Sequence, residues 1–131
     1  MIVDTSALLA ISFGEPDAER FSVALERSSS SSISAATLLE AYIVIDRRRD
    51  PIASRLFDDL VREARLIVEP FTEAQASIAR EAYRDFGRGS GHPAGLNFGD
   101  CLAYALAKDA VEPLLYKGDD FAHTDVRSAL E

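Results

Sequence analysis

The sequence lacks the features that mark secreted and membrane-spanning proteins. It has one cysteine, Cys101, so no disulfide can form within the chain. No apolar run approaches the roughly 20 residues that cross a bilayer. The start of the chain, residues 1–5, has neither the basic segment nor the apolar stretch of a signal peptide. We therefore expect a cytoplasmic protein with a reduced thiol and no attachment to a membrane.

Positive charge is also scarce, because 14 Lys and Arg residues face 22 Asp and Glu residues, for a formal net charge of -8. Proteins that hold nucleic acid on a broad basic face use Lys and Arg to displace counterions from phosphates, so the overall charge argues against that class. Two features weaken this argument. Arg47 to Arg49 form a local positive cluster, and a bound metal would offset the charge of several acids. The acidic balance would attract a basic protein partner.

Length and patterning predict an α/β fold. A chain of 131 residues with 47% hydrophobic content is long enough for one domain, spanning residues 1–131, with a sizeable core. Strands that alternate with helices predict a parallel sheet of four or five strands covered on both faces. Strands are expected at residues 1–3, around Ile33, at 66–68 and at 114–116. Helices are expected at residues 7–12, 17–26, 35–49, 51–65, 73–87, 97–108 and in a terminal segment capped by Thr124 or Asp125.

Three helix boundaries carry specific signals. A turn at Asp50-Pro51 between two apolar helical patterns predicts a helical hairpin over residues 35–65. Thr72 is expected to cap the next helix, with Gln75 as its capping-box partner. Asn97 is expected to cap the helix that follows.

The most informative pattern is a set of acids that close strands or open helices. Asp4 ends the first strand and Asp119 follows the last, while Glu40 and Asp100 lie early in helices that follow connections. In an α/β sheet such positions gather at one edge, where the parallel strands end. Gathered carboxylates repel one another and are stable together mainly with a hard divalent cation. The pattern points to a Mg²⁺ or Mn²⁺ site and to phosphoryl chemistry.

Three of these acids also have a simpler interpretation. Asp4 could cap the first helix, Glu40 could be a solvated helix position, and Asp100 could interact with a helix dipole. Any one of these positions is weak evidence for a site. Their joint placement at one edge of the sheet favours a shared function.

Few other residues offer catalytic chemistry. The sequence has two histidines, and His92, which lies in a glycine-rich loop, is more simply a solvated residue. Cys101 has no adjacent histidine to activate it, so a core position is favoured over a nucleophile. Thr5 and Ser6 could hydrogen-bond a site carboxylate or cap the first helix, and the sequence leaves both roles open.

Four segments, in order along the chain, resemble the signature segments of a known family. They are Met1 to Ala7, Glu40 in Leu38-Leu39-Glu40, Leu96 to Ala107 with its Asn-Phe-Gly-Asp-Cys run, and Leu114 to Phe121. These segments look like those of a PIN domain, and most like those of the VapC-type ribonuclease toxins of VapBC toxin–antitoxin pairs. The resemblance covers the whole chain at the usual spacing.

The resemblance implies a PIN-like three-layer α/β/α fold and the activity of a Mg²⁺-dependent endoribonuclease, with Mn²⁺ able to substitute. It implies that the chain is the toxin of a type II toxin–antitoxin pair and cleaves RNA phosphodiester bonds by a metal-activated water. It also implies a homodimer and inhibition by a cognate VapB-type antitoxin.

By position, Asp4, Glu40 and Asp100 match the family's metal-site acids. Asp4 and Asp100 would bind the first metal directly, and Glu40 would bind through water or orient the attacking water. The fourth acid is placed at Asp119, with Asp120 holding the loop, because the family's Asp-x-Asp-Phe pattern would put a glycine in the place of its first acid. The sequence leaves the choice between Asp119 and Asp120 open, and also whether one metal binds or two.

Two rival interpretations are less consistent with the sequence. A receiver-like phosphotransfer domain also has an acid after its first strand, but Asp4 is followed by no second acid and Lys117 is the only candidate lysine. A catalytically inactive PIN-like module that binds RNA or protein is disfavoured because all the acids are present. In a nuclease, Arg84, Arg88 and Lys117 could guide the RNA backbone.

Overall fold

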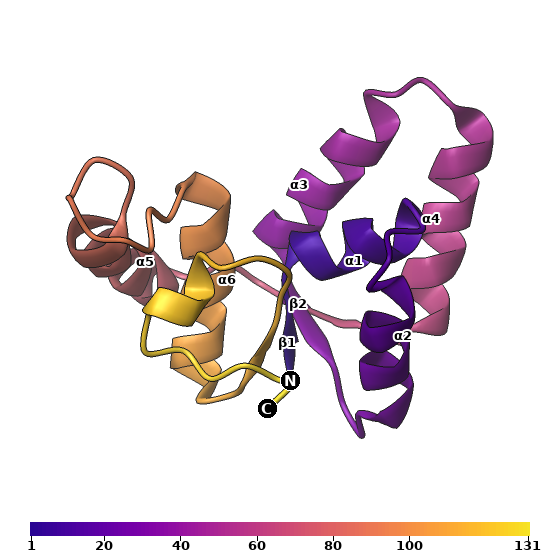
Figure 1. The fold of residues 1–131 in the computed structure, drawn as a ribbon. Coiled ribbons are helices and arrows are strands. Elements are labelled where there is room, and N and C mark those ends of the chain that lie inside the picture. The colour runs from indigo at the N-terminus through magenta and orange to yellow at the C-terminus, as the bar shows by residue number, and fades with distance from the viewer.

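Four short parallel strands form the centre of the computed structural model, which describes residues 1–131 (Figure 1). Their order in the sheet is β3-β2-β1-β4, and all three pairs are parallel. The predicted parallel sheet is therefore confirmed, with four strands. The strands are β1 (Ile2–Val3), β2 (Ser32–Ser34), β3 (Ile67–Glu69) and β4 (Leu114–Leu115).

Strands β1 and β4 are apolar because both of their faces are covered. Side chains alternate along a strand, so Ile2 packs against one helical layer and Val3 against the other. Leu114 and Leu115 divide in the same way, and all four side chains are buried. Two apolar cores therefore lie back to back across the sheet.

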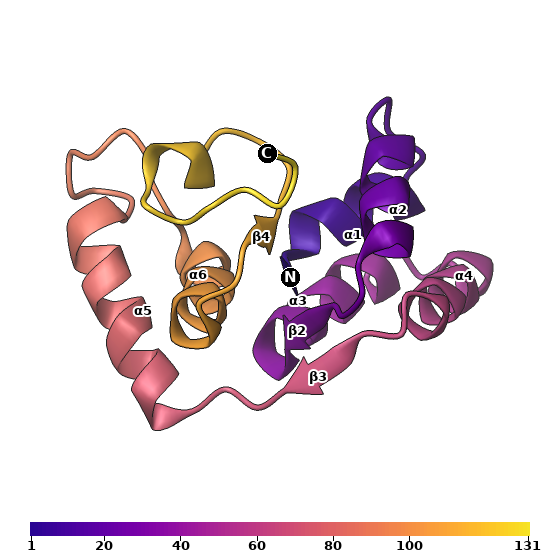
Figure 2. The same ribbon diagram turned by 90° about the horizontal axis from the view of Figure 1, so that it is seen from below.

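Six helices cover the two faces of the sheet and complete the three layers (Figures 1 and 2). One face carries α1 (Thr5–Ser12), α2 (Ala18–Arg27), α3 (Ala35–Asp46) and α4 (Pro51–Glu63). The other carries α5 (Glu73–Phe86) and α6 (Phe98–Ala110), together with the end of the chain. The predicted α/β/α architecture is confirmed, and no helix is both long and apolar enough to cross a membrane.

The predicted hairpin is present in α3 and α4. Asp50 caps α4 by accepting hydrogen bonds from the backbone N–H groups of Ile52 and Ala53, and Pro51 occupies the first turn, where a missing N–H costs little. The rings of Tyr42 and Phe57 meet edge to face at 5.6 Å between the two helices. Helix α3 ends at Asp46, three residues before the expected Arg49, because the chain must turn before Asp50 opens α4.

The predicted terminal helix is wrong. Only a short 3-10 helix, η1 (Phe121–His123), follows β4, and the segment beyond it runs beside that strand. Leu114 N–H donates to the carbonyl of Arg127 at 2.8 Å, and Ala129 N–H donates to the carbonyl of Leu114 at 2.9 Å. An isolated helix of this length is marginal, whereas the edge of β4 offers unpaired backbone groups. The segment therefore pairs with the strand.

The expected capping box at the start of α5 is only half formed. Thr72 does accept a hydrogen bond from the backbone N–H of Gln75, as predicted. The Gln75 side chain, however, donates from Nε2 to Asp109 Oδ2 on α6 at 3.3 Å and does not return to the cap. Packing of α5 against α6 places a better acceptor within its reach.

The direction in which successive strands are added to the sheet reverses at the boundary between β1 and β4. We call this boundary the open point of the sheet. From β1 the chain moves to β2 and β3 on one side, and it later returns to β4 on the other side. In open α/β sheets, ligands bind beyond the carboxyl ends of the strands at such a reversal. Asp4 is the residue that follows β1 at this point.

Candidate active site

Asp4 lies at the junction of β1 and α1 and is 4% exposed. Its backbone N–H donates to the carbonyl of Leu115 on β4 at 2.9 Å, which fixes it at the open point of the sheet. Its Oδ2 caps α1 by accepting from Ser6 N at 3.0 Å and from Ser6 Oγ at 2.5 Å. The capping role and the site position are thus held by the same residue. Ser6 Oγ also accepts from Lys117 N at 2.9 Å, which links Asp4 to the loop after β4.

Glu40 reaches the same region from the middle of α3. Thr5 Oγ1 lies 2.7 Å from Glu40 Oε1 and donates to it, so the residue next to Asp4 orients the second acid. Glu40 also lies against α6, because a Cβ added at Gly99 would stand 2.0 Å from Glu40 Oε2. Gly99 therefore leaves the space in which the Glu40 carboxylate lies.

Asp100 is held at the start of α6 by a reciprocal capping box. Its Oδ2 accepts from Asn97 N at 3.0 Å, and Asn97 Oδ1 accepts from Asp100 N at 2.8 Å. Asn97 was predicted as this cap, and the cap fixes the orientation of the Asp100 side chain. The position in the first helical turn also favours a negative charge.

The pKa shifts of Asp4 and Asp100 indicate that the three acids lie near one another. The pKa of Asp4 is raised to about 7, chiefly by burial and also by the charges of Asp100 and Glu40, against the hydrogen bonds from Ser6, which lower it. Burial likewise raises the pKa of Asp100 to about 6, with Asn97 opposing and Asp120 and Glu40 adding repulsion. The charge of Glu40 therefore acts on both Asp4 and Asp100, and that of Asp100 acts on Asp4, so the three carboxylates lie near one another.

The group has no cation of its own. None of the salt bridges in the structure includes Asp4, Glu40 or Asp100. Each carboxylate uses one oxygen for a hydrogen bond within the chain, and its other oxygen accepts none. Three oriented carboxylates with free oxygens and no salt bridge match the donor chemistry of a hard divalent cation.

The side chains are not drawn together into a metal cage. No group of three or more His, Cys, Asp or Glu side chains is arranged so that it could hold a metal ion. Repulsion among unneutralised carboxylates disfavours such a closed arrangement. The donor set fits Mg²⁺ in its chemistry, and the arrangement leaves the carboxylates separated.

The two acids of the last signature segment differ in their relation to the group. Both Asp119 and Asp120 are exposed in the loop after β4. The charge of Asp120 raises the pKa of Asp100, so Asp120 lies near the group. Asp120 opens η1 but makes no capping hydrogen bond with its side chain. Asp119 accepts from Ala122 N through its backbone carbonyl.

The remaining candidates from the sequence fall mostly into structural roles. Burial, aided by the charge of Asp100, raises the pKa of Cys101 to about 11, which removes it as a nucleophile at neutral pH. His92 accepts from Ala94 N at 3.1 Å and packs edge-on against Phe86.

The basic side chains near the group differ in how free they are. Lys117 Nζ pairs with Glu15 and, at 3.0 Å, with Asp17, so its charge is already engaged. Arg84 pairs with Asp85 at 3.0 Å. Arg88 makes no salt bridge, and its charge lowers the pKa of Asp100.

Two residues were missed by sequence reasoning. Gly99 lies in the third signature segment, and a glycine inside the first turn of a helix is the sequence signal of its role in leaving space for Glu40. Glu15 was not singled out, and its contact with Lys117 across 102 positions leaves no local trace in the sequence.

Comparison with known proteins shows the family of the chain. The family model described as PIN domain matches residues 1–127. Ribonuclease VapC28 of Mycobacterium tuberculosis is 60% identical over 131 residues, which are 100% of this chain and 98% of that protein. Ribonuclease VapC42 of the same species is 52% identical over 129 residues, covering 98% of each.

A solved structure has the same fold. The crystal structure of Mycobacterium tuberculosis VapC20, described as a Sarcin-Ricin loop cleaving toxin, matches with a TM-score of 0.72 and 17% identity over 95% of each chain. At that identity the likeness concerns the fold alone. The family match and the full-length relatives show that the chain belongs to the PIN domain family and, within it, to the VapC-type toxins.

Proposed function

We propose that this chain is a Mg²⁺-dependent endoribonuclease that acts as the toxin of a type II toxin–antitoxin pair, with Mn²⁺ able to substitute. The observation that carries the proposal is the gathering of Asp4, Glu40 and Asp100 at the open point of the sheet without a cationic partner. Relatives that span the whole chain are named ribonucleases, which supports RNA as the substrate.

In this proposal the free oxygens of Asp4 and Asp100 bind the cation. Mg²⁺, when bound, supplies Lewis acidity for phosphodiester hydrolysis and offsets charge on the phosphate. Thr5 holds Glu40 by its Oε1, so that the other oxygen is left to orient the attacking water. Ser6 and Asn97 keep the two Asp side chains in place before substrate arrives. No histidine or lysine base is needed in this arrangement.

The fourth acid stays open between two neighbours. Asp119 is the prediction from the sequence, and the repulsion between Asp120 and Asp100 makes Asp120 its competitor. Cleavage by Asp119→Asn and Asp120→Asn, measured beside their melting temperatures, separates the two roles. The site acid is the one whose substitution reduces cleavage without lowering the melting temperature.

Arg88 is the cation best placed to contact the RNA backbone. It is exposed, has no carboxylate partner, and its charge reaches Asp100. Arg84 and Lys117 are paired with acids and would have to leave them to bind phosphate. Arg47 and Arg80 line the same groove as Glu40 and also make no salt bridge. A few unpaired arginines beside the acids fit a protein whose net charge of -8 disfavours a broad basic RNA face.

The proposed partner is a VapB-type antitoxin with an apolar and basic tail. An apolar groove of about 1090 Å³ runs between α3 and the pair α5 and α6, and Glu40 lies in its wall. Its exposed apolar side chains are Leu39, Ile43, Phe71, Tyr83 and Phe98. A tail seated there could reach the candidate acids with a basic side chain. The homodimer stays a prediction, which sedimentation of the purified chain can check.

Cleavage of end-labelled RNA tests the proposed activity. The substrates should include tRNA, mRNA and the sarcin-ricin loop, the RNA named for VapC20. We expect internal cuts with Mg²⁺, none with EDTA and none with Asp100→Asn. Intact RNA under every condition, from a protein shown to be folded, would favour the alternative of an inactive PIN-like binding module.

A further inference from the structure

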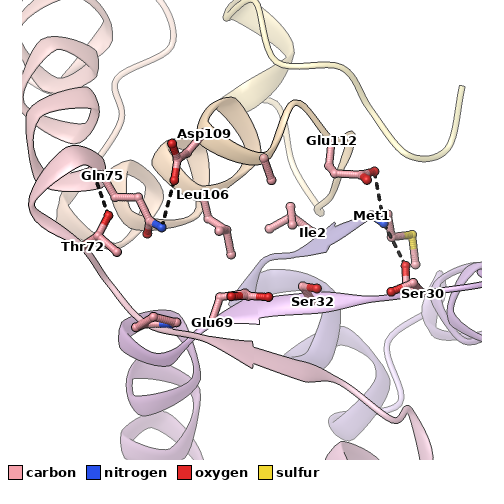
Figure 3. A pocket seen from close by; sticks show the side chains of 12 residues that line it. Met1, Ile2, Ser30, Ser32, Glu69, Thr72, Gln75, Leu106, Asp109 and Glu112 are labelled. Atoms are coloured by element: carbon pink, nitrogen blue, oxygen red, sulfur yellow. Dashed lines mark hydrogen bonds and ion pairs between the residues drawn. The ribbon is translucent and has the colours of Figure 1, made fainter.

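A second cavity lies away from the candidate acids, on the α5 and α6 face of the sheet. It has a volume of about 360 Å³, is open to solvent on one side, and is lined by the start of α5, the end of α6 and strand residues (Figure 3). Asp109 in its wall is nine residues beyond Asp100 on α6, about 13.5 Å along the helix at 1.5 Å per residue. The cavity is therefore separate from the candidate active site.

The wall of this cavity contains a buried acceptor without a donor. Gln75 is 3% exposed, and its Nε2 donates to Asp109 Oδ2 at 3.3 Å. Its Oε1 is buried and has no hydrogen-bond partner. The opposite orientation of the amide would place Oε1 against the Asp109 carboxylate, which accepts only, so the orientation is determined by its partner. A buried carbonyl of this kind is stabilised by a ligand that brings an N–H group.

The charge around the cavity is negative. Glu69, Asp109 and Glu112 line it, and no Lys, Arg or His side chain does. The amino group of Met1 lies 3.5 Å from Glu112 Oε2 and donates to the carbonyl of Ser30 at 2.9 Å. It therefore opposes one of the three carboxylates and leaves Glu69 and Asp109 unmatched. Figure 3 shows these two acids on opposite walls of the hollow, with Gln75 beside Asp109.

The remaining lining is apolar and suits a carbon chain. Ile2, Leu106 and Ala110 face the cavity between the polar groups. The volume is much larger than a bare metal ion needs, and no cluster of acids is arranged so that it could hold one. Hydrogen-bond acceptors on opposite walls of the cavity, with apolar side chains between them, match an organic cation on an aliphatic stem.

We propose that this cavity binds a small aliphatic cation, a primary ammonium or guanidinium group on a short methylene stem. Its N–H groups donate to Gln75 Oε1 and to the carboxylates of Asp109 and Glu69, and its stem packs on Leu106 and Ile2. The same chemistry comes from two sources, a free amine or the side chain of a partner's Lys or Arg.

Calorimetric titration with agmatine, which carries both an amine and a guanidinium group, tests this site on the full chain. We expect saturable binding that Glu69→Gln and Asp109→Asn each weaken about tenfold, since each loses a charge-assisted hydrogen bond. Glu73→Gln and Asp58→Asn are the matched controls, because both residues are exposed, carry the same charge and lie outside the cavity. Controls that weaken binding as much as the test variants would overturn the proposal, since attraction would then follow net charge alone.

Gln75→Leu is the second variant, because it removes the unpartnered oxygen while keeping a side chain of similar size. Its melting temperature shows whether it folds, and binding of agmatine should be lost in the folded variant. A folded Gln75→Leu protein that binds agmatine as the parent does would contradict the role of Gln75 Oε1.

Comparison of agmatine with a doubly blocked arginine distinguishes the two sources. Binding of agmatine alone identifies a free amine as the ligand class. Binding of the blocked arginine identifies a side chain presented by a protein. If neither probe binds the parent protein, the proposal is wrong.

Discussion

Asp4, Glu40 and Asp100 are each oriented by a polar residue that lies close to one of them in the sequence. Ser6 follows Asp4 by two positions, Asn97 precedes Asp100 by three, and Thr5 next to Asp4 donates to Glu40. These bonds use one oxygen of each carboxylate and fix the direction of the other. The short sequence motifs thus encode both the acids and their orientation.

Asp4→Asn should remove activity without weakening the fold. Its carboxylate is buried without a cation and repelled by Asp100 and Glu40, so an amide of the same shape relieves an unfavourable charge. We expect cleavage to fall by roughly 100-fold or more. Thermal melting in EDTA should show a midpoint equal to or above that of the parent. A clearly lower midpoint would mean that Asp4 is needed mainly for its capping bonds with Ser6.

Gly99→Ala should reduce activity while leaving stability nearly unchanged. The new methyl group would stand 2.0 Å from Glu40 Oε2, and the carboxylate, as the end of a flexible side chain, can move away. We expect the free energy of unfolding to change by less than about 1 kcal/mol, because alanine is favoured over glycine in a helix. Cleavage should fall by about 100-fold, the effect of a misplaced catalytic group.

The double variant Gly99→Ala with Glu40→Gln provides the control for this positioning role. If Gly99 acts by making room for Glu40, the second change should add little to the first. If the losses of cleavage in the two single variants multiply in the double variant, Gly99 does not act through Glu40.

At the scale of elements, the helices with strong capping and apolar signals were predictable, and those that depend on distant partners were not. Asp50-Pro51 and Asn97 mark the starts of α4 and α6 as expected. The segment after Thr124 has turn residues that resemble a helix cap, but its conformation is decided by β4, which no local pattern shows. The Gln75 side chain likewise donates a hydrogen bond to Asp109 on another helix and makes none to the local cap.

The same distinction holds for the site. The acids and their caps are local, so Asp4 and Asp100 could be found from the sequence. Three other features depend on chain segments that meet only in the fold. They are the closeness of Asp120 to Asp100, the space that Gly99 leaves for Glu40, and the ion pair of Lys117 with Glu15. These were the points that the sequence left open or missed.

The C-terminal segment is attached to α6 by Asp125, and this attachment should depend on pH. Asp125 accepts from Tyr104 at 2.6 Å and Lys108 at 2.8 Å, and these partners hold its pKa below the usual range. A lowered pKa in the folded state adds stability above the unfolded pKa of about 4 and loses it as pH falls through the folded value.

Asp125→Asn should therefore lower the melting midpoint at pH 7 by about 1 to 3 °C, a small effect because the pair is largely exposed. The difference between variant and parent should shrink as pH falls from 4 toward 2. Melting curves across this range check it, and a difference that stays constant with pH would show that the charge of Asp125 is not responsible.

At the scale of the whole molecule, the net charge of -8 and the apolar groove define the expected antitoxin. A tail with apolar residues for the groove and an Arg or Lys for Glu40 would complement the apolar lining and this acid. Arg47, Arg80 and Arg88 in the same lining would pair with acids of the tail. We expect its affinity, measured by calorimetry, to fall with rising salt and to fall about tenfold in Glu40→Gln. Exposed Glu73→Gln is the matched control. Equal affinity in the parent and Glu40→Gln would show that the antitoxin binds by shape alone.

Binding of Mn²⁺, followed by the electron paramagnetic resonance of the free ion, tests most directly whether the gathered acids form a metal site. The parent should bind the ion, and Asp100→Asn should bind it about tenfold or more weakly and fail to cleave RNA. Exposed Asp58→Asn, with the same change of charge, should bind and cleave as the parent does. Equal Mn²⁺ affinity in the parent and Asp100→Asn would contradict a metal site built on Asp4, Glu40 and Asp100.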